Sequence, residues 1–178
     1  MSQNVRVMIF IDGSNLHWAR MNYNKTNKTN LKIDFKKMLE LLAGSRFLVR
    51  AMYYCSKPIP PIDPRQIRFL DYLRNIGIQV IEKPLKTRTD LATKTMFKVE
   101  KGVDVALAID LIGMAWEDAY DTAVLVSGDE DYLGAVNKVM SKGRNVEVAV
   151  FRNSLSAELR KAVLKITYLD DIINLIKL

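Results

Sequence analysis

Four aspartates are spaced so that the fold could bring their carboxylates together. Asp12 directly follows an apolar segment at residues 5–11, and Asp129 and Asp131 follow another at 122–126. Asp104 opens a helical pattern that precedes the second of these segments. Aspartates favour helix caps and turns, which would explain each one separately but not their convergence. Because crowded carboxylates repel one another unless cations lie between them, we predict one site for Mg²⁺ or Mn²⁺.

Such a site is suited to hydrolysis of a phosphodiester bond. A bound ion can generate hydroxide from water and neutralise charge on the attacked phosphate, and a second ion about 3.5 to 4 Å away could stabilise the leaving oxygen. We predict Asp12 and Asp129 as the central ligands, with Asp104 and Asp131 completing or orienting the set. The pattern is compatible with one ion or two.

Other polar residues lie beside these carboxylates in the sequence. Asn15 can orient a water ligand or contact a phosphate, and Ser14 and Ser127 offer hydroxyl groups to a substrate. Each of the three can equally be a cap or a turn former. Asp110 lies six residues after Asp104, so it points about 240° around the same helix and is not a predicted ligand.

The segments that must position these residues alternate between strand and helix patterns. Strands are predicted at 5–11, 48–54, 78–81, 122–126 and 146–151, with 166–169 as a candidate edge strand. Helices are predicted at 16–21, 34–43, 65–76, 103–116, from 127–131 to about 142, and at 156–164. Alternation of this kind predicts parallel pairing through right-handed crossovers, with ligands bound beyond the carboxyl ends of the strands. We therefore expect one α/β domain over residues 1–178, with a central, mainly parallel sheet of about five strands flanked by helices.

Composition restricts the class of protein and its partners. The chain has 178 residues, and its 27 basic against 20 acidic residues give a net charge of +7, which favours a polyanionic partner such as nucleic acid. A single cysteine and a single histidine exclude an intramolecular disulfide and a structural zinc site. The apolar runs are too short for a signal peptide or a membrane span, so we expect a cytoplasmic protein without a membrane partner.

A basic segment at residues 83–101 shows little apolar periodicity and is predicted to be a long functional loop. The substrate-binding candidates in it are Lys86, Arg88, Lys94, Lys98 and Lys101. Together with Lys25 and Lys28, in a second predicted loop at 22–30, they would hold phosphates on both sides of the acidic cleft. Trp18, Tyr23 or Phe97 could stack on an unpaired base, although each is as well explained by packing.

Three motifs resemble those of the NYN domain family, which belongs to the PIN-like nuclease superfamily. They are FIDGSNL at 10–16, KGVDVALAIDL at 101–111 and VSGDEDY at 126–132, and their order and spacing match across most of the chain. The resemblance implies a three-layer PIN-like fold, which is Rossmann-like, and metal-dependent endonuclease activity, usually on RNA. It assigns the catalytic positions to Asp12, Asn15, Asp104, Asp129 and Asp131. Glu130 is a departure, because relatives often have a small or neutral residue there.

Other enzyme classes fit the sequence poorly. Ser14 stands where an aspartyl-phosphate transferase needs an acid, and Phe151 and Arg152 stand where a phosphorelay receiver needs a lysine. The DGSNLH segment at 12–17 lacks the glycine pattern of a dinucleotide-binding turn. The serious alternative is a non-catalytic RNA-binding or regulatory protein that retains the fold. We predict a metal-dependent endoribonuclease and leave open a homodimer and activity on DNA.

Overall fold

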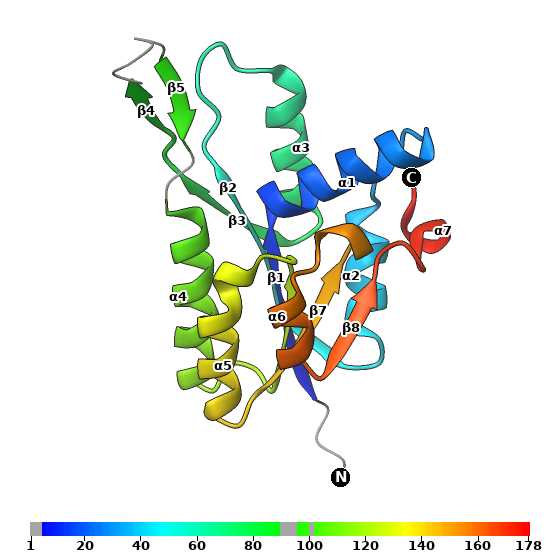
Figure 1. Cartoon of the computed structure of the whole chain (residues 1–178), viewed down its shortest axis with the longest axis vertical. Helices are drawn as coiled ribbons and strands as arrows, with labels where there is room; N and C mark the ends of the chain where they lie inside the picture. The colour runs from blue at the N-terminus through cyan, green and yellow to red at the C-terminus, as the bar shows by residue number, and fades with distance from the viewer. Residues whose placement is uncertain (1–4, 90–95, 100–101) are drawn as a thin grey trace.

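A six-stranded, all-parallel sheet forms the centre of the computed structural model, which describes residues 5–89, 96–99 and 102–178 (Figure 1). In spatial order the strands are β3 (Ile78–Lys83), β2 (Phe47–Ser56), β1 (Arg6–Asp12), β6 (Thr122–Val126), β7 (Asn145–Val150) and β8 (Lys165–Tyr168). The predicted α/β fold with a parallel sheet is therefore confirmed. The candidate edge strand pairs with β7 as β8 and brings the sheet to six strands.

Helices cover both faces of this sheet (Figure 1). They are α1 (Gly13–Asn27), α2 (Phe35–Ala43), α3 (Pro64–Asn75), α4 (Val103–Trp116), α5 (Leu133–Ser141), α6 (Ala157–Ala162) and α7 (Ile173–Ile176), with short 3-10 turns η1 (Glu130–Tyr132) and η2 (Arg152–Ser154). None of the helices within the described ranges is long and apolar enough to span a membrane.

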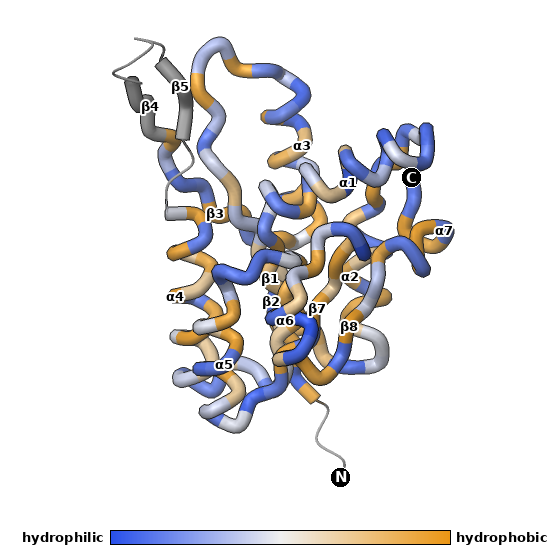
Figure 2. Tube along the Cα trace, viewed as in Figure 1, coloured by the Kyte–Doolittle hydropathy of each residue, from blue (hydrophilic) through white to orange (hydrophobic). Residues whose placement is uncertain are grey.

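Strand β1 shows how the sequence produces this layered arrangement. Its side chains alternate between the faces: Val7, Ile9 and Ile11 pack with α1, α2 and α3, whereas Met8 and Phe10 pack with α4, α5 and α6. All five are at most 1% exposed, and burial of each contributes about 1.5 to 3 kcal/mol. Figure 2 shows the apolar residues along the centre of the fold. A strand buried on both faces must be central, as predicted.

The register of the central strands aligns their carboxyl ends. Ile11 of β1 pairs with Val126 of β6, and Asp12 pairs with Tyr54 of β2. Residues that follow β1 and β6 therefore emerge next to each other, at the edge of the sheet where ligands of such folds bind.

The predicted loop at 22–30 is wrong over residues 22–27, because α1 continues to Asn27, and residues 28–30 form the turn and loop after it. Lys25 lies within the helix, and Lys28 is its left-handed C-cap. Tertiary contacts support the extra turns: the ring of Tyr23 packs on Phe151 at 5.3 Å between centroids, and Oδ1 of Asn24 accepts a hydrogen bond from Leu31 N at 2.8 Å. Such contacts stabilise a helical segment that has little apolar periodicity of its own.

The predicted long loop at 83–101 is also wrong over most of its described residues, which form strands. Strand β3 extends to Lys83, and β4 (Lys86–Thr89) pairs antiparallel with β5 (Met96–Val99). A two-stranded hairpin satisfies its backbone polar groups by pairing, so it can form without the apolar periodicity of a core element. Lys94 and Lys101 lie outside the described residues.

Candidate functional site

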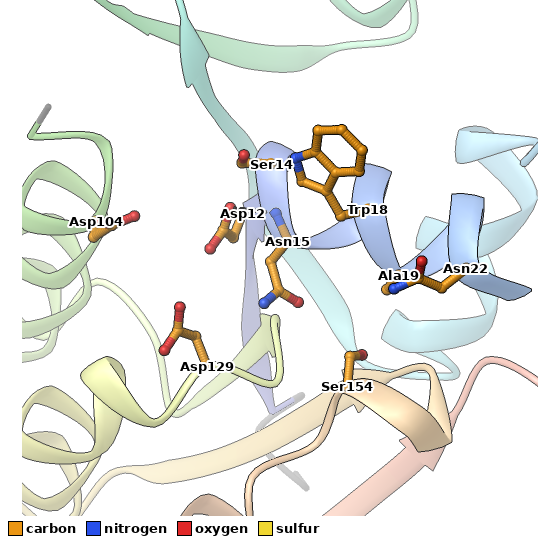
Figure 3. Close-up of a pocket in the computed structure, with 9 residues that line it drawn as sticks. All are labelled: Asp12, Ser14, Asn15, Trp18, Ala19, Asn22, Asp104, Asp129 and Ser154. Atoms are coloured by element: carbon orange, nitrogen blue, oxygen red, sulfur yellow. Dashed lines mark hydrogen bonds between the residues drawn. The ribbon is translucent and has the colours of Figure 1, made fainter. Parts of the chain in front are cut away.

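A polar pocket of about 350 Å³ lies at the carboxyl edge of β1 and β6. Its lining residues are Asp12, Ser14, Asn15, Trp18, Ala19, Asn22, Asp104, Asp129 and Ser154 (Figure 3). Asp12 comes from β1, Asp104 from the first turn of α4, and Asp129 from the connection after β6. Three of the four predicted carboxylates thus meet from segments that are far apart in the sequence.

Asp12 is buried, with 2% of its surface exposed, and is held by hydrogen bonds at both carboxylate oxygens. Oδ1 accepts from the backbone N–H of Asn15 at 3.0 Å and thereby caps α1. Oδ2 accepts from the hydroxyl of Tyr132 at 3.0 Å and from Ser127 Oγ at 3.3 Å. These bonds offset the cost of burying the charge and fix the orientation of the carboxylate.

Tyr132 is a residue of the candidate site that our sequence analysis missed. Its hydroxyl lies between two carboxylates, 3.0 Å from Asp12 Oδ2 and 3.5 Å from Asp104 Oδ1. Burial raises the pKa of Tyr132, and the negative charges of Asp12, Asp104 and Asp129 raise it further, so the phenol stays protonated at neutral pH. Its position at the end of the VSGDEDY motif was the available signal, but its partner Asp12 lies 120 residues away.

Asp129 and Asp131 occupy different environments despite their closeness in sequence. Asp129 is half-buried, lines the pocket and caps η1, because its Oδ1 accepts from Asp131 N at 3.1 Å. The backbone N–H of Asp129 donates to Ser127 Oγ at 3.3 Å. Asp131 is exposed and does not line the pocket. The structure therefore brings together Asp12, Asp104 and Asp129, and leaves the Asp131 carboxylate outside this group.

Two glycines allow the segments around the pocket to approach closely. A Cβ atom on Gly13 would lie 2.5 Å from the ring of Tyr53, and one on Gly128 would lie 1.9 Å from the carbonyl oxygen of Ser154. The backbone N–H of Gly128 also donates to Asn15 Oδ1 at 3.2 Å. Asn15 therefore connects α1 to the segment after β6, a positioning role that sequence reasoning did not identify.

The predicted substrate-binding residues differ in their access to the pocket. Ser14 lines it, whereas Ser127 is 1% exposed and holds Asp12 and Asp129 in place. Lys86, Arg88 and Lys98 lie in the hairpin formed by β4 and β5, whose side chains are not described.

Two of the aromatic candidates for stacking can be placed. Trp18 is 65% exposed and lines the pocket beside the carboxylates (Figure 3). Tyr23 packs against Phe151 and so serves the core. Phe97 lies in β5, and its side chain is not described.

Asp110, which is not a predicted ligand, accepts a hydrogen bond from the hydroxyl of Tyr54 at 2.9 Å.

The donor set bears on which metal could bind. Within residues 5–89, 96–99 and 102–178, no three carboxylate, imidazole or thiol side chains are arranged to hold an ion by themselves. Mg²⁺, however, usually keeps several waters and needs only one or two carboxylates. Oxygen ligands and an open polar pocket fit a hydrated Mg²⁺ or Mn²⁺ ion, and they do not fit an ion enclosed entirely by protein.

The parallel sheet, its helical layers and the acidic residues at its carboxyl edge define a PIN-like α/β domain. The NYN domain matches residues 6–170, and the chain belongs to this family of PIN-like nucleases. It is 29% identical over 175 residues to the low amplitude and bright protein LabA of Synechococcus elongatus, covering 97% of this chain and 88% of the relative. A crystal structure of a protein of unknown function from Vibrio parahaemolyticus has the same fold, with a TM-score of 0.78 at 23% identity, covering 100% of this chain and 99% of that chain.

Proposed function

We propose that this protein is an endoribonuclease that hydrolyses RNA phosphodiester bonds with Mg²⁺ or Mn²⁺. The observation that carries the proposal is the convergence of Asp12, Asp104 and Asp129 on one pocket around the hydroxyl of Tyr132. Membership of the NYN domain family supports a nuclease class and RNA as the nucleic acid. A cytoplasmic location and a homodimer stay predictions from the sequence.

The residues at the pocket would have different roles in the reaction. Asp12 and Asp129 would be the central metal ligands, and Asp104 lies across the hydroxyl of Tyr132 from Asp12. Asp131 would complete the set only through water or a movement of its exposed side chain. When bound, the metal would supply an activated water and neutralise charge on the phosphate. Tyr132 holds the carboxylate of Asp12 in position.

Substrate would be held on both sides of this acidic centre. The exposed ring of Trp18 is a stacking surface for an unpaired base next to the carboxylates. Phosphates would be contacted by Ser14 and by the basic segment that contains Lys86, Arg88, Lys94, Lys98 and Lys101. The net charge of +7 favours association with a polyanion of any sequence.

Cleavage of labelled single-stranded and structured RNA in Mg²⁺, Mn²⁺ or EDTA tests the proposal. We expect cleavage only with metal, and a loss in Asp12→Asn and Asp129→Asn greater than the roughly 10- to 100-fold effect of changing the outer partners of metal ligands. Asp110→Asn is the matched control, because Asp110 lies on the same helix as Asp104 but bonds to Tyr54. Cleavage that survives in EDTA or in both aspartate variants would overturn the proposal.

A non-catalytic RNA-binding or regulatory protein is the second candidate. It is favoured by the lack, among the described residues, of a three-ligand metal cluster, and the name of the LabA relative states no enzymatic activity. RNA binding without metal-dependent cleavage would support it. Calorimetry with Mn²⁺ separates the two candidates further. Only the nuclease requires a bound ion, and Asp12→Asn should then weaken the binding of Mn²⁺.

A further inference from the structure

A second and larger pocket, of about 820 Å³, lies on the opposite face of α1 from the acidic pocket. At about 100° per residue, Asn15 and Trp18 point to one face of the helix and His17 and Arg20 to the other. Ser14 lines both pockets, so they adjoin at the first turn of α1. The volume falls within the range of about 300 to 1,000 Å³ that is typical of small-ligand sites.

Aromatic rings form much of the wall of this second pocket. Phe35, Tyr53 and Phe69 contact one another edge to face, with centroids 5.5 to 6.0 Å apart, and Tyr72 also lines the cavity. Mutual contact holds the three rings in place. Phe35 and Tyr53 are only 6% and 7% exposed, so the more exposed ring surface at the cavity is that of Phe69 and Tyr72, which are half-buried. Such surface accepts planar bases by stacking, with little dependence on which base is present.

Cationic side chains stand around the aromatic wall. Arg20, Lys32 and Arg65 line the pocket, and Arg20 is held by its hydrogen bond to the backbone oxygen of Leu31 at 2.8 Å. Among the described lining residues, the one side-chain carboxylate is that of Asp63, which pairs with Arg65 at 2.9 Å. Leu178 also lines the pocket and carries the terminal carboxylate. The rim therefore carries net positive charge, which suits a phosphate group.

We propose that this second pocket binds one nucleotide, with the base against the aromatic wall and the phosphate at the cationic rim. The proposal rests on the proposed function, because an RNA strand crossing the first turn of α1 would place a neighbouring nucleotide here while its scissile phosphate lies in the acidic pocket. A free mononucleotide has the same chemistry and is the other source of such a ligand.

Cys55 provides a test, because it lines this pocket and is the only cysteine of the chain. Its rate of alkylation by iodoacetamide is measured in EDTA with each 5′-mononucleotide, with ribose 5-phosphate, and with a short single-stranded RNA. A nucleotide at ten times its Kd should slow alkylation by about tenfold, as expected for competitive occupancy. Ribose 5-phosphate should protect less, because it has no base.

A charge variant and its control test the rim. Lys32→Gln should weaken nucleotide protection by up to about fivefold, the effect of an exposed ion pair. Lys36→Gln should leave nucleotide protection unchanged, because Lys36 is exposed on α2 and does not line the pocket. Equal effects of the two variants would mean general charge attraction and would overturn the phosphate assignment.

The outcomes also separate the two ligand sources and the two proposals. Stronger protection by the RNA than by a mononucleotide identifies the strand, and protection by the mononucleotide alone identifies a free nucleotide; both support the site. No protection by either, or equal protection by ribose 5-phosphate, overturns it. Metal-dependent cleavage without protection would refute the nucleotide site and support the nuclease. Protection without cleavage would support the nucleotide site and refute the nuclease.

Discussion

Replacing Tyr132 with phenylalanine removes one hydroxyl from the centre of the carboxylate group and keeps the buried ring. Tyr132 is 1% exposed, and its hydroxyl donates to Asp12 Oδ2 at 3.0 Å. A hydrogen bond to a charged group contributes about 1.5 to 3 kcal/mol. We therefore expect Tyr132→Phe to lower the free energy of unfolding by that amount, measured by urea denaturation at pH 7 in EDTA.

Tyr120→Phe is the control for this substitution. Tyr120 is 0% exposed, and its hydroxyl donates to the backbone oxygen of Leu111 at 2.6 Å. Because that acceptor is neutral, the expected loss is only about 0.5 to 1.5 kcal/mol. In thermal scans Tyr132→Phe should lower the Tm by roughly 3 to 12 °C, given about 2 to 4 °C per kcal/mol for a chain of this size.

Manganese should change the effect of one variant and not the other. With saturating Mn²⁺ the cation would neutralise part of the charge on Asp12, so the loss caused by Tyr132→Phe should shrink relative to EDTA. The loss caused by Tyr120→Phe should stay the same. If Tyr132→Phe costs no more than Tyr120→Phe in EDTA, the bond to Asp12 does not stabilise the fold. If Mn²⁺ fails to raise the stability of the unmodified protein, the metal site itself is refuted.

Two further predictions concern the backbone at the site and the acid stability of the fold. Gly128→Ala should destabilise the protein, because its Cβ would lie 1.9 Å from Ser154 O, whereas Gly134→Ala, with open space around it in α5, should stabilise by up to about 1 kcal/mol in urea denaturation. Equal effects would show that the close approach relaxes freely. Hydrogen bonding from Arg6 lowers the pKa of Asp121, so the stability it contributes is present above its unfolded pKa of about 3.9 and is lost as pH falls through the lower folded pKa. Asp121→Asn should therefore flatten the decline of urea midpoints below about pH 4, and a slope equal to that of the unmodified protein would contradict this assignment.

Local patterns in the sequence determined the parts of this protein that depend on burial and chain order. The apolar, β-branched run of β1 requires burial on both faces, so its central place follows from its composition. Because Asp12 ends β1 and Asp129 lies shortly after the end of β6, the edge at which they emerge follows from parallel pairing. The NYN motifs identified the family for the same reason: they are contiguous residues, readable without the fold.

Contacts between distant segments were decided only by the tertiary structure. The hydroxyl of Tyr132 reaches Asp12 because β6 pairs beside β1 in one register, and no local pattern encodes that pairing. The 3-10 turn η1 carries Asp131 away from the pocket, and the second pocket forms where α1, α2, α3 and β2 come together. The periodicity of side chains records which face of an element is buried. Which atoms meet there depends on strand order, register and close approach, and these are properties of the whole folded chain.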